Sequence, residues 1–588
     1  MPNSLHTRPA VPRFDRRFFD GSEQFTCIGS GEYGGKAHSL LSVKDMLATR
    51  LDERARRHFD VTVPTLTVVA TDVFETFMAE NQLWDLATSG EPDHRIAAAF
   101  LAAALPTELV GDLWALIRQV HTPLAVRSSS LLEDALHQPF AGVYATKMIP
   151  NNQHDVESRF HRLVEAIKFV YASTFFANAR NYRRLTGHGS DDRMAVILQA
   201  IVGRRHRDLF YPELSGVARS YSFYRSGRTR PEDGVVNLAL GLGKSIVDGG
   251  ITWSYSPAYP QATPPYGSVG ELLKQTQVQF WAVNMGRPAA YDPLTEAEYL
   301  VHGSLPDADE DGTLRYLAST YDARSDRMSM GVGIRGPRVL NFAPLLVLEE
   351  YGLNALLKAM LCLCQDALGA PVEIEFAVTF PAEDEDGPAR FGFLQVRPMS
   401  VSDTVVNVDL DAVDRSHVLL ASDRVMGNGI LTDIQDIVYV RPDAFETRHT
   451  PAIAEDIAHL NLRLIDQGTP YLLLGFGRWG SSDPWLGIPV AWSQIGGARA
   501  IVEATLPSMN VDLSQGSHFF HNISSFNVSY FSVAFDGPFA IDWDGLSRLP
   551  AVAETAFVRH VRVPRPLRVE VDGRTGHGVV LWESRVRE

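Results

Sequence analysis

Cysteine is scarce in this sequence. Only Cys27, Cys362 and Cys364 occur among its 588 residues. Three is an odd number, and it is too few for a disulfide framework or a four-cysteine zinc site. Such scarcity is typical of proteins from a reducing compartment, so we expect the protein to be cytoplasmic.

Long apolar runs and an excess of positive charge are also missing. The longest apolar run, 96–105, has about half the length of a membrane-spanning helix. The first 17 residues contain no apolar segment of the kind found in secretory signals. The 70 acidic side chains outnumber the 54 basic ones, which gives a net charge of −16. These features predict no membrane and no nucleic acid as partners, and they favour a small ligand.

The overall composition is that of an ordinary globular protein. Hydrophobic residues make up 45%, aromatic residues 10% and charged residues 21% of the chain. These values exclude collagen, coiled coils and wholesale disorder. A chain of this length is expected to hold about three to five domains or subdomains.

Hydrophobic periodicity predicts several elements along the chain. Apolar residues at helical spacing follow the glycine-rich loop 29–35 and predict a helix over 35–50. Thr71 or Asp72, with Glu75 three residues beyond Asp72, resembles a capping box and predicts a helix over 73–81. The other predicted elements are strands at 63–70, 123–130, 141–149 and 194–203, helices at 155–183 and 345–368, and a β-hairpin at 371–398.

The predicted hairpin carries polar side chains on one face. Because side chains alternate along a strand, Glu373 and Glu375 point away from the apolar residues between them. The same alternation places Phe393, Gln395 and Arg397 of the return strand on the face of the two glutamates. Carboxylate and amide oxygens are ligands for Mg²⁺, and a guanidinium binds phosphate. A solvent-exposed hairpin with a surface ion pair explains the same pattern.

Two further segments place a cation beside a turn. Lys36 follows two glycines at the start of a predicted helix, where free backbone N–H groups favour an anion. Arg127 stands with two serines at the end of a predicted strand, an arrangement that suits phosphoryl oxygens. Each also has a plainer interpretation, a surface lysine at a helix N-terminus and a capped turn with a surface arginine.

Together these segments resemble the N-terminal nucleotide-binding domain of the phosphoenolpyruvate synthase and pyruvate phosphate dikinase family, which has the ATP-grasp fold. Six blocks match in order over about 370 residues. They are GEYGGKAHSL, VPTLTVVATDVFETFM, VRSSSLLEDALHQPFAGVYAT, LQAIVG, LALGLGKSIVDGG and the hairpin VEIEFAV with FLQVRP. An ordered set of this kind is much more specific than any single block.

The resemblance implies an α+β fold in which two lobes trap Mg-ATP between them. It implies an N-terminal extension at 1–20, a first lobe at 21–200, and a second lobe with the metal-binding hairpin at 201–405. The residues 406–588 carry a hydrophobic pattern of their own, which predicts a separate mixed α/β C-terminal domain, and a divergent phosphocarrier is one interpretation of it. The resemblance also implies roles for eight residues. Lys36 and Arg127 contact the phosphates, Gln199, Ile201 and Val202 hold the adenine, Glu375 and Gln395 ligate Mg²⁺, and Arg397 neutralises charge on the transferred phosphoryl group.

The chain departs from the family pattern in two places. Lys244 stands where the family's glycine loop ends in glutamate. The SGV segment at 215–217 continues as Ala218-Arg219-Ser220 in place of the family's phenylalanine-threonine. We therefore expect the contacts to the nucleotide to differ here from those of the family.

The C-terminal region holds two segments with open interpretations. Gln515-Gly516-Ser517-His518 offers His518 as a catalytic phosphate carrier, because a neutral imidazole accepts a phosphoryl group. Packing of His518 among neighbouring phenylalanines explains the same residues. The glycine-rich segment 475–485, with Arg478 and two tryptophans, predicts either a second ligand pocket or a tight packed turn.

These inferences predict an ATP-dependent phosphotransferase of the dikinase type with ATP and Mg²⁺ as cofactors. We expect the chain to lack the barrel that binds pyruvate or phosphoenolpyruvate in the family. We therefore expect the phosphate acceptor to be His518, a small molecule or a protein. A separate partner chain that carries the barrel is a further alternative. Two alternatives stay open, a regulatory protein that binds ATP without catalysis and an ATP-grasp ligase that forms an acyl-phosphate.

Overall fold

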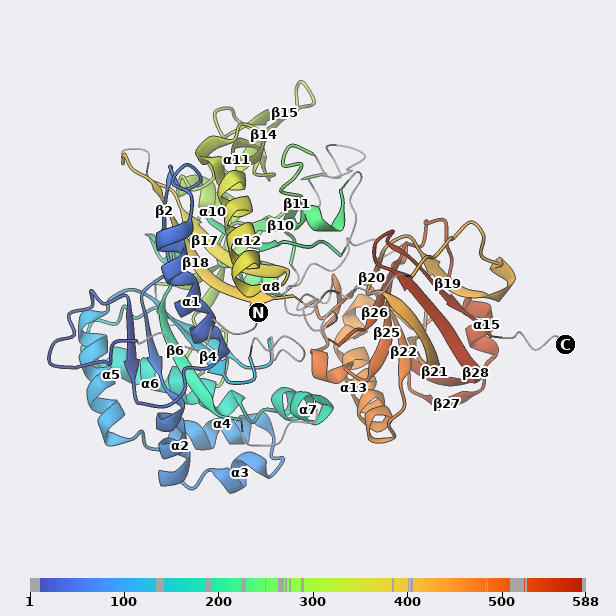
Figure 1. Ribbon diagram of the computed structural model, residues 1–588, viewed down its shortest axis with the longest axis horizontal. Coiled ribbons are helices and arrows are strands. Elements are labelled where there is room, and N and C mark those ends of the chain that lie inside the picture. The colour runs from blue at the N-terminus through green and yellow to red at the C-terminus, as the bar shows by residue number, and fades with distance from the viewer. Residues whose placement is uncertain are drawn as a thin grey trace.

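Three large β-sheets organise the computed structural model of this chain (Figure 1). The structure describes residues 11–583 apart from 134–141, 187–191, 224–228, 249, 263–268, 270–271, 274–275, 287–289, 383–384, 400, 402–405, 482, 484, 508–522 and 524–525. Two of the sheets lie on one side of the molecule, and the third lies on the other side with the C-terminal end of the chain. The protein therefore has mixed α/β content with several separate sheets.

The first sheet has five strands and supports the N-terminal residues of the site. Its order is β1 (Phe25–Ile28), β3 (Leu66–Val69), β6 (Met194–Ala200), β4 (Leu124–Ser130) and β5 (Thr146–Ile149). Only the β1–β3 pair is parallel. The helices that belong to this part are α1 (Gly35–Arg50), α2 (Thr71–Glu80), α3 (Trp84–Thr88), α4 (Asp93–Ala102), α5 (Thr107–Gln119), α6 (Val156–Ser173) and α7 (Ala177–Thr186).

The second sheet, called the hairpin sheet here, has six strands. Its order is β11 (Trp253–Tyr255), β10 (Val235–Ala239), β9 (Leu214–Arg219), β17 (Val372–Thr379), β18 (Ala389–Pro398) and β2 (Phe59–Thr62). The apolar side chains of β17 join a buried cluster with those of helix α12 (Leu353–Leu368). Because the side chains of a strand alternate, the polar residues of β17 lie on the opposite face.

Smaller elements surround the hairpin sheet. A four-stranded sheet has the order β13 (Leu300–Ser304), β12 (Gln279–Asn284), β8 (Leu209–Tyr211) and β7 (Arg204–His206). A three-stranded sheet has the order β15 (Arg327–Met330), β14 (Ala318–Asp322) and β16 (Arg338–Leu340). The short helices are α8 (Lys244–Val247), α10 (Leu305–Glu310) and α11 (Ala343–Leu346).

The C-terminal sheet runs through β19 (Val418–Ser422), β29 (His577–Leu581), β28 (Val558–Asp572), β21 (Gly429–Val440), β22 (Tyr471–Phe476), β25 (Ala498–Ala504), β26 (Ser529–Val533) and β20 (Val425–Met426), with β27 (Ala551–Glu554) beside β28. Helices α13 (Thr450–Asp466) and α15 (Trp543–Arg548) and the pair β23 (Arg478–Trp479) and β24 (Gly487–Ile488) accompany it. The edge strands β19 and β20 are consecutive in the chain, and the Ser422 hydroxyl donates to the Ser532 carbonyl at 2.5 Å. The sheet therefore curls back on itself.

The C-terminal sheet is tied to helix α7 of the first part. The rings of Tyr182 and Phe526 meet edge to face at 5.6 Å, and Phe526 stacks on Trp492. The Ser493 hydroxyl donates to Asn178 at 2.6 Å. These contacts place the C-terminal sheet beside the first sheet (Figure 1).

Most predicted elements are confirmed, and three details are wrong. The predicted helix at 345–368 is broken, because Glu349, Tyr351 and Gly352 adopt positive φ angles between α11 and α12. Asp72 does not cap α2. Its carboxylate instead accepts hydrogen bonds from the backbone and side chain of Ser30 at 2.8 Å, and thereby ties the glycine-rich loop to the start of α2. The region predicted as helical at 155–183 consists of two helices, α6 and α7.

Within the described ranges, no single helix combines the length and apolar character of a membrane span. Taken together, α4 and α5 meet these two criteria, but they are bent by 87°.

Candidate functional site

A glycine places Lys36 against strand β4. Gly34 has φ 78°, and a Cβ at this position would lie 1.7 Å from the Ser129 carbonyl oxygen. Only glycine allows the loop to approach the strand so closely. The Ser129 hydroxyl donates to the Tyr33 carbonyl at 2.8 Å and accepts from the Ala37 amide at 3.2 Å, so it anchors the start of α1.

Lys36 is buried and paired. Its amino group donates to Glu133 at 2.8 Å and to the Ser128 hydroxyl at 3.3 Å. The other oxygen of Glu133 accepts from the Ser130 amide at 2.8 Å. Because Ser128 directly follows Arg127, this ion pair lies beside the next cation of the site.

Arg127 connects the first sheet to the hairpin sheet. Its Nη1 donates to Gln199 of β6 and to the Leu394 carbonyl of β18, both at 3.0 Å. Its Nη2 donates to the Gln395 side-chain oxygen at 2.7 Å. The Arg127 guanidinium therefore bridges two other predicted site residues, Gln199 and Gln395, which lie far apart in sequence.

A row of charged residues crosses the hairpin sheet on its polar face. Arg219 of β9, Glu373 of β17 and Arg397 of β18 are paired side by side in the ladder. Arg397 donates to Glu373 at 2.8 Å and to Glu375 at 2.7 Å. Arg219 donates to the second oxygen of Glu373 at 2.6 Å and to Asn237 of β10 at 3.2 Å. The row is buried, since the side chain of Arg397 is 1% exposed and that of Arg219 is 7% exposed.

The surface-hairpin alternative is therefore wrong, and one part of the predicted polar face is also wrong. Phe393 lies in the apolar cluster, opposite Phe376, and not on the face of the glutamates. The reason is a bulge. Gln395 pairs with Glu375 but Phe393 pairs with Phe376, so Leu394 is an extra residue that reverses the alternation of its strand.

Gln199, Ile201 and Val202 lie where the chain leaves β6. The Nε2 group of Gln199 is buried and has no hydrogen-bond partner among the described residues. Ile201 packs against a small apolar cluster, and Val202 lies against Gly392 of β18, where a Cβ would come within 2.4 Å of it. The cluster consists of Phe210, Leu242, Val283 and Met285, with Met148, Trp281 and Leu300 beside it.

The two departures from the family pattern have different surroundings. Lys244 begins α8 and forms an ion pair with Asp248 at 2.9 Å. Its amino group also lies 5.8 Å from the centre of the Trp281 ring. Arg219, in contrast, is part of the charged row. From the sequence, Arg219 is only a departure from the family pattern, because no strand is predicted between 203 and 345 on which alternation could place it.

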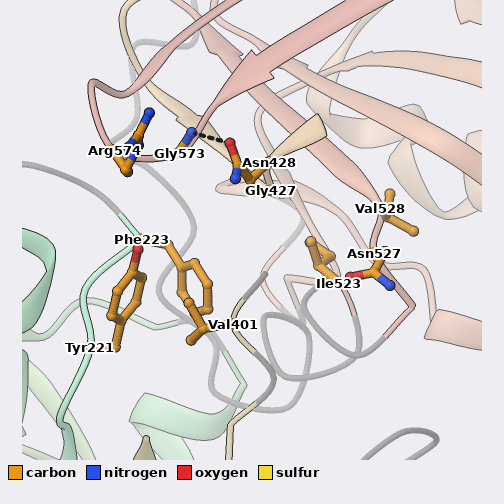
Figure 2. Close-up of a pocket in the computed structure, with 10 residues that line it drawn as sticks. All are labelled: Tyr221, Phe223, Val401, Gly427, Asn428, Ile523, Asn527, Val528, Gly573 and Arg574. Carbon is orange, nitrogen blue, oxygen red and sulfur yellow. Dashed lines mark hydrogen bonds between the residues drawn. The ribbon is translucent and has the colours of Figure 1, made fainter. Parts of the chain in front are cut away.

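A pocket lies between the hairpin sheet and the C-terminal sheet (Figure 2). One wall consists of Tyr221 and Phe223, which follow β9, and Val401, which follows β18. The opposite walls come from turns of the C-terminal sheet, including Asn428 and Asn527. The rings of Tyr221 and Phe223 meet edge to face at 5.2 Å. The pocket therefore lies beyond the ends of the two strands that carry Arg219 and Arg397.

The two C-terminal predictions have different outcomes. His518 and its neighbours lie outside the described residues. Arg478 and Trp479 lie in a packed turn, in which Trp479 donates to the Val502 carbonyl at 3.0 Å and a Cβ at Gly475 would lie 2.4 Å from the Trp479 ring. Trp485 points to solvent, with 72% of its surface exposed. The packed-turn interpretation therefore fits this segment.

Comparison with known proteins shows the family. A family model described as the pyruvate phosphate dikinase AMP/ATP-binding domain matches residues 31–415, roughly two thirds of the chain. The chain belongs to this family. It is 26% identical over 192 residues to the "uncharacterized phosphotransferase YvkC" of Bacillus subtilis, an alignment that covers 32% of this chain and 20% of that protein.

A second relative carries a more specific name. The chain is 26% identical over 223 residues to the "prodigiosin synthesizing transferase PigC" of Serratia marcescens, an alignment that covers 37% of this chain and 21% of that protein. The matched segments thus span only about a fifth of the length of each relative. The shared part supports an ATP-binding module of the phosphotransferase type.

Proposed function

We propose that this chain is an ATP-dependent phosphotransferase of the dikinase type that binds Mg-ATP between the first sheet and the hairpin sheet, as in an ATP-grasp fold. The observation that carries this proposal is the Arg127 bridge, which joins Gln199 of one sheet to Gln395 of the other. Family membership supports the nucleotide as the ligand.

The cations in this region suit a polyphosphate. Lys36 and Arg127 lie at the first sheet, and Arg397 lies at the hairpin sheet. Guanidinium groups bind phosphoryl oxygens in a bidentate manner and stabilise charge that develops during phosphoryl transfer. We assign the phosphate contacts and the catalytic cations to Lys36, Arg127 and Arg397, and the adenine contacts to the chain around Gln199, Ile201 and Val202.

Glu375 and Gln395 fit a magnesium ion. They are paired across β17 and β18, and their side chains share one face. Mg²⁺ in nucleotide sites typically takes one or two protein ligands and completes its shell with phosphates and water. Two oxygen ligands are therefore enough here. When bound, the ion would neutralise charge on the phosphates, and Arg127 and Arg397, which now hold these two side chains, would keep their oxygens on the site face.

We further propose that the phosphate acceptor binds in the pocket of Figure 2, against the C-terminal region at 406–588, which acts as a separate domain. The support is its position. Tyr221 is two residues beyond Arg219, and Val401 is four residues beyond Arg397, so the chain between the charged row and these walls spans at most about 7–13 Å. Aromatic rings and amide side chains suit a small organic acceptor.

The test is incubation with Mg²⁺ and ATP labelled at the β-phosphate, with AMP, ADP and label on the protein as readouts. We expect AMP, together with label on the protein or on an acceptor, and loss of turnover in Glu375→Gln. The control is Glu570→Gln, which removes a strand carboxylate paired with Arg568 outside the site. His518→Ala tests the carrier.

The other outcomes separate the alternatives. Release of ADP without AMP would favour a ligase that forms an acyl-phosphate. Binding of ATP without turnover would favour a regulatory nucleotide sensor. A protein that binds no ATP would contradict the proposal as a whole.

A further inference from the structure

Arg219 has an unusual position for an arginine. It is buried in the middle of the hairpin sheet, and its Nε and Nη1 groups donate to Glu373 and Asn237. Its Nη2 group is also buried, but it has no hydrogen-bond partner among the described residues. A buried charged donor without a partner is costly, because it has lost its hydration and has gained no contact in return.

Arg219 and Arg397 share the carboxylate of Glu373, one guanidinium on each oxygen. Arg397 also binds Glu375, and Arg127 adds a third guanidinium on the Gln395 side. Arg219 is therefore held in place through Nε and Nη1, while its buried Nη2 group has no acceptor among the described residues. A fixed guanidinium with an unused donor suits an anionic ligand.

We propose that Arg219 and Arg397, held together by Glu373, form a site for a phosphate oxyanion, and that Arg219 contacts this anion through Nη2. The ligand class is pyrophosphate or the equivalent phosphate end of a nucleotide. This inference deepens the proposed function, and it rests on that function for the assignment of a nucleotide as the natural ligand. Binding of free pyrophosphate, however, requires no phosphotransfer activity.

The arrangement of the sheet supports this assignment. Arg219, Glu373 and Arg397 are direct neighbours in the ladder, so their side chains project from the same face. Glu375 and Gln395 follow two residues further along the same face. An anion held by Arg219 would therefore lie beside the proposed metal ligands, at the strand ends nearest to the pocket.

The experiment measures binding of pyrophosphate to the full chain by calorimetry, without nucleotide and without Mg²⁺. The variants are Arg219→Met, which removes the charge, and Arg219→Lys, which keeps the charge but loses the forked donors. The control is Arg338→Met, because Arg338 also pairs with a carboxylate through Nε, on the separate sheet of β14, β15 and β16. ADP and AMP serve as second probes that separate a nucleotide end from a free anion.

We expect Arg219→Met to weaken pyrophosphate binding by about 10–100-fold, the usual effect of one charge-assisted hydrogen bond, and Arg338→Met to leave it unchanged. If Arg219→Met weakens the binding of ADP by a larger factor than the binding of AMP, the diphosphate end of the nucleotide lies at Arg219. Unchanged pyrophosphate affinity in folded Arg219→Met would overturn the inference. If Arg219→Met does not fold, unchanged pyrophosphate affinity in Arg219→Lys would overturn the inference, because the forked donors are lost in that variant. A wild-type protein that binds no pyrophosphate would also overturn the inference.

The two proposals fail separately. Pyrophosphate binding that depends on Arg219, in a protein that never turns over ATP, would leave the anion site in place and remove the phosphotransferase function. Normal AMP release by Arg219→Met, together with unchanged pyrophosphate affinity, would remove the anion site at Arg219 and leave the phosphotransferase function in place.

Discussion

The hairpin sheet and the C-terminal sheet each bury a carboxylate that holds two basic side chains. In the hairpin sheet, Glu373 binds Arg219 and Arg397. In the C-terminal sheet, Asp436 of β21 accepts from His560 of β28 at 2.6 Å and from the Arg562 Nε group at 3.0 Å.

The two clusters differ in what surrounds them. The Asp436 cluster joins two adjacent strands, and the Arg562 side chain is 51% exposed, so one carboxylate is balanced by one solvated arginine. The Glu373 cluster continues into Glu375, Gln395 and Arg127, and its Arg219 Nη2 group has no hydrogen-bond partner in the part of the chain that the structure describes. Burial of charge alone therefore does not mark a functional site. The extension of the network between two sheets and the unsatisfied buried donor of Arg219 do.

The largest expected effect is on activity. Glu375→Gln should lower Mg²⁺-dependent ATP turnover by about a thousandfold, because a ligand for the charge-neutralising ion is lost. Its melting temperature should change little, because Arg397 keeps its bond to Glu373. The comparison would break if Asp436→Asn, the equivalent change in the other cluster, lowered turnover equally in folded protein.

Lys36→Met should reduce the free energy of unfolding by about 4 kcal/mol, because it leaves Glu133 buried without a cation. Urea unfolding measures this loss. The double variant Lys36→Met with Glu133→Gln should regain most of the stability but none of the ATP affinity. Recovery of both properties would show that Lys36 has only a structural role.

Glu213 extends the comparison to a buried carboxylate that forms no ion pair with any described residue. Burial raises the pKa of Glu213 to about 7, and its Oε2 atom has no hydrogen-bond partner in the described part of the chain. Between pH 4.5 and 7 the unfolded chain releases this proton while the folded protein keeps it, so stability falls as pH rises. Above pH 7 the loss reaches about 3 kcal/mol.

Glu213→Gln should remove this pH-dependent loss. Urea unfolding of the wild type and the variant between pH 4 and 8 measures it. The variant should be the more stable protein above pH 7, and the two curves should converge near pH 4. Parallel curves across the whole range would show that Glu213 ionises normally in the folded state.

The smallest effect is expected at Asp436. Burial raises the pKa of Asp436, but hydrogen bonds from His560 and Arg562 outweigh burial and lower it below its usual value. Its stabilising contribution is therefore present above about pH 4 and is lost as pH falls through the lowered pKa. Asp436→Asn should cost about 2 kcal/mol at neutral pH in urea unfolding, with ATP binding retained. An unchanged midpoint at pH 7 would contradict this stabilising role.

Local patterns predicted much of the candidate site. The glycine-rich loop before a helical repeat identified Lys36, and strict alternation in the hairpin identified Glu375, Gln395 and Arg397. Such signals depend on residues close together in sequence, so no knowledge of the fold was needed. Phe393 was misplaced because one extra residue at Leu394 reverses the alternation. The adjacent apolar pair Phe393-Leu394 marks this break in the sequence, but it does not tell which of the two residues faces the core.

The sequence by itself determined the family, the main elements of the first sheet, the hairpin and most of the residues that face the site. Tertiary structure decided which of them meet. Arg219 joins Glu373 because β9 lies beside β17, although about 150 residues separate the two strands in the chain. Arg127 reaches Gln395 because the first sheet and the hairpin sheet come together there. Such contacts between distant segments arise from packing and sheet order, which local periodicity does not encode.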